Sequence, residues 1–181
     1  DDVESRGLGD VYKRQHEDGE VIKQVSQEIY NTGEVVDKSE IGAYWWNEFQ
    51  KAFNSAYGDR FETQRKLEYQ SLKKTIKYFK STANAQELSD LMFAHWIKPP
   101  IFEESKQFFE MCPVPIYIVS NIDRDDVLKA IEYHGLNPAG IFTSEDAKSY
   151  KPRKELFEFA LNSTGLSVEQ VVHLSLIHIS E

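Results

Sequence analysis

The stretch that decides the fold runs from Ile116 to Asn121 and reads IYIVSN. It is a short apolar run rich in β-branched residues, with two prolines just before it and Asp123, a predicted helix N-cap, just after it. A run of this kind, without polar alternation and bounded by residues that interrupt regular structure, is typical of a strand buried on both faces. The sequence therefore predicts a buried strand over 114–119 that ends at a hydroxyl and an amide side chain.

Downstream of this strand, predicted helices and strands alternate. The pattern predicts a helix over 123–135, a strand over 140–143, a helix over 152–165 and a strand over 171–174. Strands and helices in alternation at this spacing favour a parallel sheet with right-handed crossovers. We therefore predict the α/β fold class for residues 99–174, with a Rossmann-like parallel sheet as the core.

Upstream of the same strand, the sequence has the period of helices. Apolar residues recur three and four positions apart over 20–30, 39–57, 63–79 and 85–96, and the proline pair at 99–100 ends the last of these segments. This spacing places the apolar residues of each segment on one helical face. Residues 16–98 are therefore predicted to form a separate helical bundle.

Composition excludes several classes of protein. The 181 residues contain 21 Lys and Arg against 30 Asp and Glu, a net charge of −9 that argues against a nucleic-acid binder. The single cysteine, Cys112, cannot form a disulfide within the chain and fits a reducing compartment. No apolar run approaches the ~20 residues that a membrane-spanning helix needs. We expect a cytoplasmic protein that acts on neither membranes nor nucleic acid.

The candidate site residues follow the predicted strands. Ser120 and Asn121 end the first strand, and Lys151 precedes the proline that opens a later helix. Ligands of open parallel sheets bind beyond the carboxyl ends of the strands, where a hydroxyl and a helix amino terminus suit a phosphoryl oxygen. A lysine at that edge can neutralise a phosphate or a carboxylate nucleophile. Each residue also has an ordinary explanation, since serine and asparagine are common in turns and most lysines are solvated.

Four segments in this order carry a family resemblance: Ile118–Asp123, Phe142–Asp146, Tyr150–Pro152 and Val171–His173. Together they resemble the haloacid dehalogenase-like (HAD) hydrolases, in the helical-cap subgroup of phosphatases and dehalogenases. The resemblance implies that Ser120 binds the transferring phosphoryl group, with Asn121 beside it. It implies that Lys151 stabilises an aspartyl nucleophile and the phosphoryl charge, and that 16–98 is the cap domain. We predict that Asn121 binds phosphate together with Ser120 and Lys151.

The activity that the resemblance implies is Mg²⁺-dependent hydrolysis of a small phosphorylated metabolite, a phosphate monoester, through an aspartyl-phosphate intermediate. Dehalogenation is a second activity within the same resemblance. Two other classes stay open: a phospho-receiver signalling domain, which also pairs a strand-end hydroxyl with Lys-Pro, and a non-catalytic helical interaction module.

Two motifs of the family are missing where they are expected. No strand ending in Asp-x-Asp precedes the helical block, and no acidic metal motif follows 171–173. Residues 1–15 and 175–181 resemble translated sequencing-adapter read-through, so we expect both segments to be non-native. The chain is therefore predicted to be an interior fragment whose sheet lacks its first strand. It is also expected to lack the metal ligands and to have no turnover.

Overall fold

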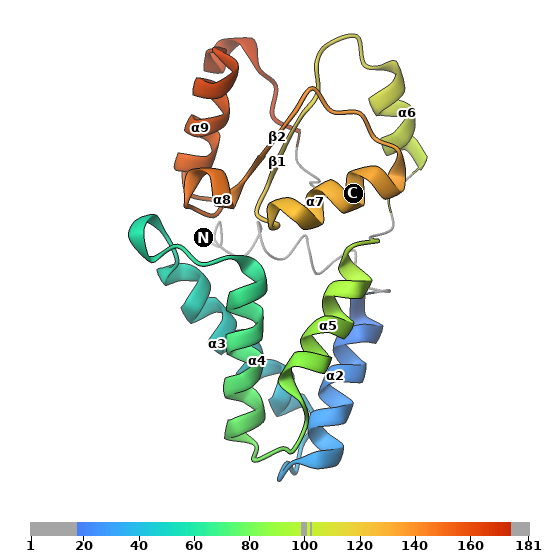
Figure 1. Ribbon diagram of the computed structural model, residues 1–181, viewed down its shortest axis with the longest axis vertical. Coiled ribbons are helices and arrows are strands. Elements are labelled where there is room, and N and C mark those ends of the chain that lie inside the picture. Colours follow the sequence, from blue (N-terminus) through green and yellow to red (C-terminus); the bar gives the residue numbers. More distant parts are fainter. Residues whose placement is uncertain (1–17, 99–100, 102, 175–181) are drawn as a thin grey trace, which may run out of the picture.

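The computed structural model describes residues 18–98, 101 and 103–174, so the predictions for 1–15 and 175–181 fall outside it. Figure 1 shows a helical part and, above it, a part that contains the strands. The elements are α2 (Asp18–Thr32), α3 (Ser39–Ser55), η1 (Gly58–Arg60), α4 (Gln64–Tyr78), α5 (Ala85–Trp96), α6 (Glu103–Met111), β1 (Tyr117–Ser120), α7 (Arg124–His134), β2 (Gly140–Thr143), α8 (Ser144–Ala147), α9 (Glu155–Thr164) and η2 (Val168–Gln170).

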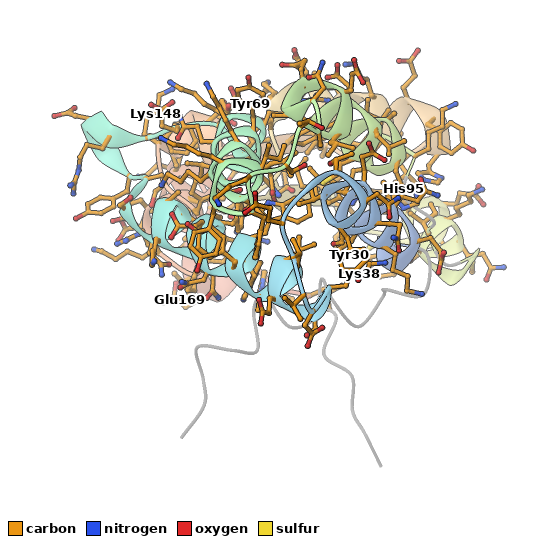
Figure 2. The ribbon with its side chains drawn as sticks, turned by 90° about the horizontal axis from the view of Figure 1, so that it is seen from below. Tyr30, Lys38, Tyr69, His95, Lys148 and Glu169 are labelled. Atoms are coloured by element: carbon orange, nitrogen blue, oxygen red, sulfur yellow. The ribbon has the colours of Figure 1, made fainter. Side chains whose placement is uncertain are left out.

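Helices α2 to α5 pack into a bundle with its own apolar core, as the residue spacing predicts. The most deeply buried members of this core come from all four helices: Val25, Ile29, Ile41, Leu72 and Met92. Glu68 is a buried charged residue of this bundle, and a view from below shows Lys148 and Glu169, which belong to the other part, at the periphery of the molecule (Figure 2). None of the described helices is both long and apolar enough to cross a membrane.

Local signals at the helix ends explain where several helices begin and stop. The Thr63 side chain accepts a hydrogen bond from the Lys66 amide, and the Asn84 side chain accepts two from the first turn of α5. Gly135 and Gly165 end α7 and α9 in the left-handed conformation, with φ of 66° and 69°. This conformation favours glycine, because a β-carbon would crowd the following carbonyl.

The strands β1 and β2 form a parallel two-stranded sheet, and α9 packs against both of them. In its register Tyr117 lies opposite Gly140 and Ser120 opposite Thr143, so both strands end at the same edge. A small parallel sheet joined to a helical bundle confirms the predicted fold class. Within the described residues β1 has no second strand partner.

The predicted strand over 171–174 is wrong. These residues are irregular and exposed, with Val172 at 86% and Leu174 at 68% of their full accessibility. A β-branched run becomes a strand only when a neighbouring strand satisfies its backbone hydrogen bonds. The described residues place no strand beside this segment.

Candidate functional site

The predicted site residues gather at the edge where β1 and β2 end. Ser120 is the last residue of β1, and its Oγ accepts a hydrogen bond of 3.1 Å from the backbone N–H of Ile122. Directly opposite in the sheet, Thr143 ends β2 and is fully buried. Helices α7 and α8 follow these two strand ends, so their amino termini flank the same edge.

Lys151 reaches this edge from the loop before α9. Its ammonium Nζ donates to the carbonyl oxygen of Val119 at 2.9 Å, next to Ser120 in the chain. The side chain of Asn121 bonds the backbone of Lys151 twice: Oδ1 accepts from the Lys151 N–H at 2.6 Å, and Nδ2 donates to the Lys151 carbonyl at 3.1 Å. The structure therefore brings all three predicted residues together, while what they bind stays a prediction.

The ammonium of Lys151 lies in a partly buried place. The residue is half-buried, and burial lowers the pKa of its ammonium below the usual value of 10.5. The acceptor at Val119 is a neutral carbonyl, so this contact leaves the positive charge without a compensating carboxylate. A cation held in this way gains from a bound anion more than a solvated surface lysine would.

Four acidic side chains near this edge accept hydrogen bonds from other groups of the protein. They are Asp123, Asp126, Glu145 and Asp146. Asp146 closes a capping box with Thr143 and also binds Arg124, while Glu145 accepts from the Arg124 backbone N–H at 2.6 Å. Among the residues that the structure describes, no group of three or more His, Cys, Asp or Glu could hold a metal ion. These carboxylates therefore do not fit a Mg²⁺ site.

Asp123 has a different partner from the one that the local sequence predicts. It occupies the N-cap position of α7, but its carboxylate makes no cap bond to that helix. Instead it accepts from the backbone N–H groups of Gln64 at 2.7 Å and Arg65 at 2.9 Å, the first two residues of α4. A residue of the α/β part thus caps a helix of the bundle. Burial raises the pKa of Asp123 despite these two donors.

Arg65 completes this contact between the two parts of the molecule. Its guanidinium binds the buried Asp126 through two hydrogen bonds, of 2.7 Å from Nε and 2.6 Å from Nη2. It also lies over the ring of Phe93, 4.1 Å from the centroid. We call the contacts of Arg65 and Gln64 with Asp123 and Asp126 the α4–α7 junction.

Tyr150, the residue before Lys151, makes a second contact between the parts. It is 2% exposed and its hydroxyl donates to the Glu62 carbonyl at 2.7 Å. Its ring packs against Phe53 and Phe61, at centroid distances of 4.3 and 5.2 Å. Sequence reasoning missed this role. The available signal was an aromatic residue in a polar loop, beside the predicted site lysine.

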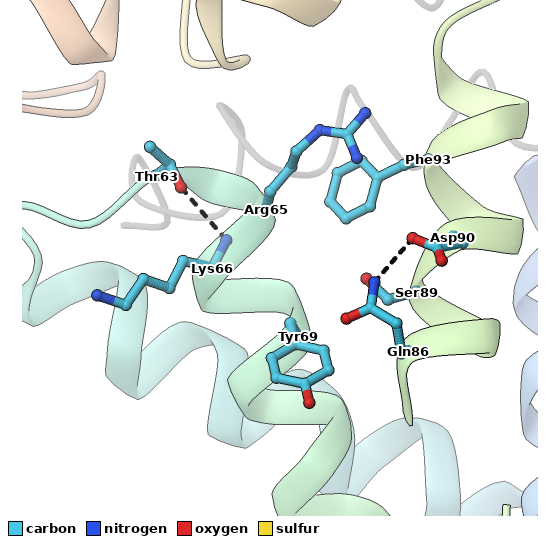
Figure 3. A pocket seen from close by; sticks show the side chains of 8 residues that line it. All are labelled: Thr63, Arg65, Lys66, Tyr69, Gln86, Ser89, Asp90 and Phe93. Carbon is cyan, nitrogen blue, oxygen red and sulfur yellow. Dashed lines mark hydrogen bonds between the residues drawn. The ribbon is translucent and has the colours of Figure 1, made fainter. Parts of the chain in front are cut away.

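A cavity of about 260 Å³ lies between α4 and α5 rather than at the sheet edge. Its lining is mostly polar, and Figure 3 shows Arg65 and Phe93 stacked at one end, with Tyr69 and Gln86 nearer the other. The cavity adjoins the α4–α7 junction because Arg65 belongs to both. Neither Ser120 nor Lys151 lines it.

Solved structures resemble this chain, although no family model and no curated protein sequence matches it. An L-2-haloacid dehalogenase superimposes with a TM-score of 0.62 at 14% identity, over 82% of this chain and 65% of that one. The L-2-haloacid dehalogenase from Xanthobacter autotrophicus gives 0.58 at 16% identity, over 72% and 54%. The fold is that of the HAD-like hydrolases.

A HAD hydrolase from Bacillus subtilis, solved with bound magnesium, gives a TM-score of 0.59 at 16% identity over 82% of this chain and 67% of that one. The chain spans 54 to 65% of the length of the two dehalogenases above. At these identities the likeness establishes the fold, including the helical cap. The assignment of α2 to α5 to that cap, and of the elements from α6 onward to the core, stays a prediction.

Proposed function

We propose that this chain is part of a hydrolase of phosphate monoesters, in which Ser120 and Lys151 bind the transferring phosphoryl group. The observation that carries the proposal is the position of the Lys151 ammonium, which bonds the backbone carbonyl of Val119, the residue before Ser120, at the carboxyl end of β1. A phosphoryl group presents several negatively charged oxygens, which match a cation, a hydroxyl and the amino terminus of α7. The substrate we expect is a small phosphorylated metabolite of the cytoplasm.

In this proposal each residue has a defined task. The Ser120 hydroxyl donates a hydrogen bond to one phosphoryl oxygen, while its oxygen keeps accepting from the backbone N–H of Ile122. The Lys151 ammonium stabilises the charge that develops on the phosphoryl oxygens during transfer. Mg²⁺ is the cofactor that the family resemblance implies, and the tasks of Ser120 and Lys151 do not depend on it.

Titration of the chain with inorganic phosphate tests this proposal. In two-dimensional NMR spectra we expect saturable shifts of the Ser120 amide and of the Lys151 side-chain signals. Lys151→Met should weaken phosphate binding at least about tenfold, since it removes a charge-assisted contact of about 1.5–3 kcal/mol. Ser120→Ala should weaken it less, because a neutral hydroxyl contributes about half as much.

Lys154→Met is the matched control. Lys154 lies three residues from Lys151, is exposed, and pairs with Glu158 on the surface of α9. This variant loses the same charge and should keep the wild-type affinity for phosphate. Equal weakening by both lysine variants would show a general charge effect and would contradict the proposal. An absence of phosphate binding by the wild-type chain would contradict it as well.

Dehalogenation is the second candidate, favoured by the similar structures, several of which are L-2-haloacid dehalogenases. The carboxylate of a 2-haloacid could use the same lysine. A competition titration separates the two activities: phosphate should displace L-2-chloropropionate if the site is built for a dianion. The opposite order of affinities would favour the dehalogenase. A helical interaction module would show no dependence on Lys151 in either titration.

A further inference from the structure

Both polar atoms of the Asn121 side chain form hydrogen bonds with the backbone of one residue, Lys151. Its Oδ1 and Nδ2 bond the N–H and the carbonyl of Lys151, at 2.6 and 3.1 Å, across 30 positions of sequence. The backbone carbonyl of Asn121 is also held in place, because it accepts a hydrogen bond of 2.9 Å from the hydroxyl of the fully buried Ser144. Asn121 therefore joins the end of β1 to the loop that carries the lysine.

A lysine side chain needs such a connection if its charge is to lie in one place. Four rotatable bonds separate the Lys151 ammonium from its backbone, so an unrestrained Lys151 would spread its charge over a wide volume. Here two groups of the same strand end fix both ends of the residue. Asn121 holds the backbone, and the Val119 carbonyl holds Nζ at 2.9 Å.

We propose that Asn121 is a positioning residue, which fixes the Lys151 backbone so that the ammonium lies beside Ser120 at the phosphoryl site. This inference rests on the proposed function and reassigns Asn121 within it. The side chain acts through Lys151 rather than as a phosphate ligand, since both of its polar atoms are committed to the Lys151 peptide. Residues that orient the ligands of a metal typically change metal affinity or activity by about 10- to 100-fold when they are removed, and we expect an effect of that order on phosphate here.

Two substitutions at this position separate placement from charge. Asn121→Ala removes both hydrogen bonds and adds no charge. Asn121→Asp is nearly isosteric and can still accept from the Lys151 N–H, but it sets a carboxylate oxygen against the Lys151 carbonyl, where Nδ2 donates in the wild type. Both variants should weaken phosphate binding about tenfold or more. A role as a mere surface turn would leave the affinity unchanged.

The experiment measures three quantities on the full chain: hydrogen exchange of the Lys151 amide, the pKa of Lys151 from its ¹³Cε shift, and the affinity for inorganic phosphate. Lys151→Arg assigns the lysine signal. In Asn121→Ala we expect faster amide exchange and a pKa that returns toward 10.5, because the released side chain becomes solvated. In Asn121→Asp the new carboxylate should raise the pKa further, although phosphate binding is weakened.

Asn84→Ala is the matched control for lost stability. This substitution also removes two side-chain hydrogen bonds to backbone N–H groups. They lie at the start of α5 in the cap, away from Lys151. It should leave all three quantities at their wild-type values. Unchanged Lys151 exchange or unchanged phosphate affinity in a folded Asn121→Ala variant would overturn the positioning role. If the wild-type chain binds no phosphate, the proposed function fails, and the exchange rate and pKa of Lys151 still decide the role of Asn121.

Discussion

The α4–α7 junction gives the sharpest prediction about stability. Arg65 and Asp126 are joined by two short hydrogen bonds, with Asp126 almost fully buried and Arg65 38% exposed. The perturbation is a double-mutant cycle of Arg65→Met and Asp126→Asn, which keeps the length of the arginine stem and the shape of the carboxylate. The cycle isolates the pair energy from the contact of Arg65 with Phe93, which both arms containing Arg65→Met lose equally.

The magnitude follows from the burial of the two partners. Breaking a fully buried ion pair costs about 3–5 kcal/mol, and exposed pairs contribute about 0–1 kcal/mol. This pair lies between these limits, because water reaches the arginine and not the aspartate. We therefore expect a coupling energy of about 2 kcal/mol, and a larger loss for Arg65→Met, which leaves a buried carboxylate, than for Asp126→Asn.

Urea unfolding followed by circular dichroism measures the four free energies of unfolding. The matched control is the cycle of Lys154→Met and Glu158→Gln on α9, where the side chains are 78% and 52% exposed. That pair should show a coupling of about 0.3–0.5 kcal/mol. A coupling at Arg65 and Asp126 no larger than this control would refute the view that the junction holds the cap on the core.

Four further predictions concern single residues. Glu68 is buried, and burial raises the pKa of its carboxyl from 4.5 to about 8. Because the folded state holds a proton that the unfolded state has released, stability should fall as pH rises from about 4.5 through about 8. Glu68→Gln should remove most of this slope in urea titrations at pH 5 and pH 8. Gly33→Ala should lower the thermal midpoint, since a β-carbon would lie 2.7 and 2.8 Å from two backbone carbonyl oxygens. Gly42→Ala, where a β-carbon meets nothing within 4 Å, should raise it. Tyr150→Phe should cost about 1–2 kcal/mol in urea unfolding, because the Glu62 carbonyl loses its donor.

The fold could be predicted from the sequence wherever the signal is local and periodic. The helices of the cap follow apolar spacing, and the stops at Gly135 and Gly165 follow the conformational freedom of glycine. The prediction of a strand at 171–174 is wrong because strand formation depends on a neighbouring strand. A β-branched run such as Val171 and Val172 does not show whether that neighbour exists. Its composition suits a strand, and its surroundings do not provide one.

In the candidate site, too, residues with a local sequence signal could be predicted and residues with distant partners could not. Ser120 and Lys151 could be found because each follows a recognisable strand or precedes a helix-opening proline. The partners of Asp123 and Tyr150 could not be found, since they lie 59 residues away at Gln64 and 88 residues away at Glu62. The local sequence predicted the N-cap position of Asp123, but its carboxylate accepts hydrogen bonds from backbone N–H groups of another helix, α4. Tertiary contacts decide such choices, and one sequence does not record them.

The segment from Val119 to Asp126 links the site to the cap. Val119 and Asn121 fix Lys151, and Asp123 and Asp126, a few residues later, hold the start of α4. Both sets of hydrogen bonds, those to Lys151 and those to α4, start within the eight residues from Val119 to Asp126. A displacement of the Lys151 contacts is therefore either transmitted through these residues to α4 or absorbed by them. If the segment transmits it, phosphate bound at Lys151 should slow amide exchange at the start of α4. If the segment absorbs it, exchange there should depend on Asp123 alone, and the cap would then be anchored independently of the ligand.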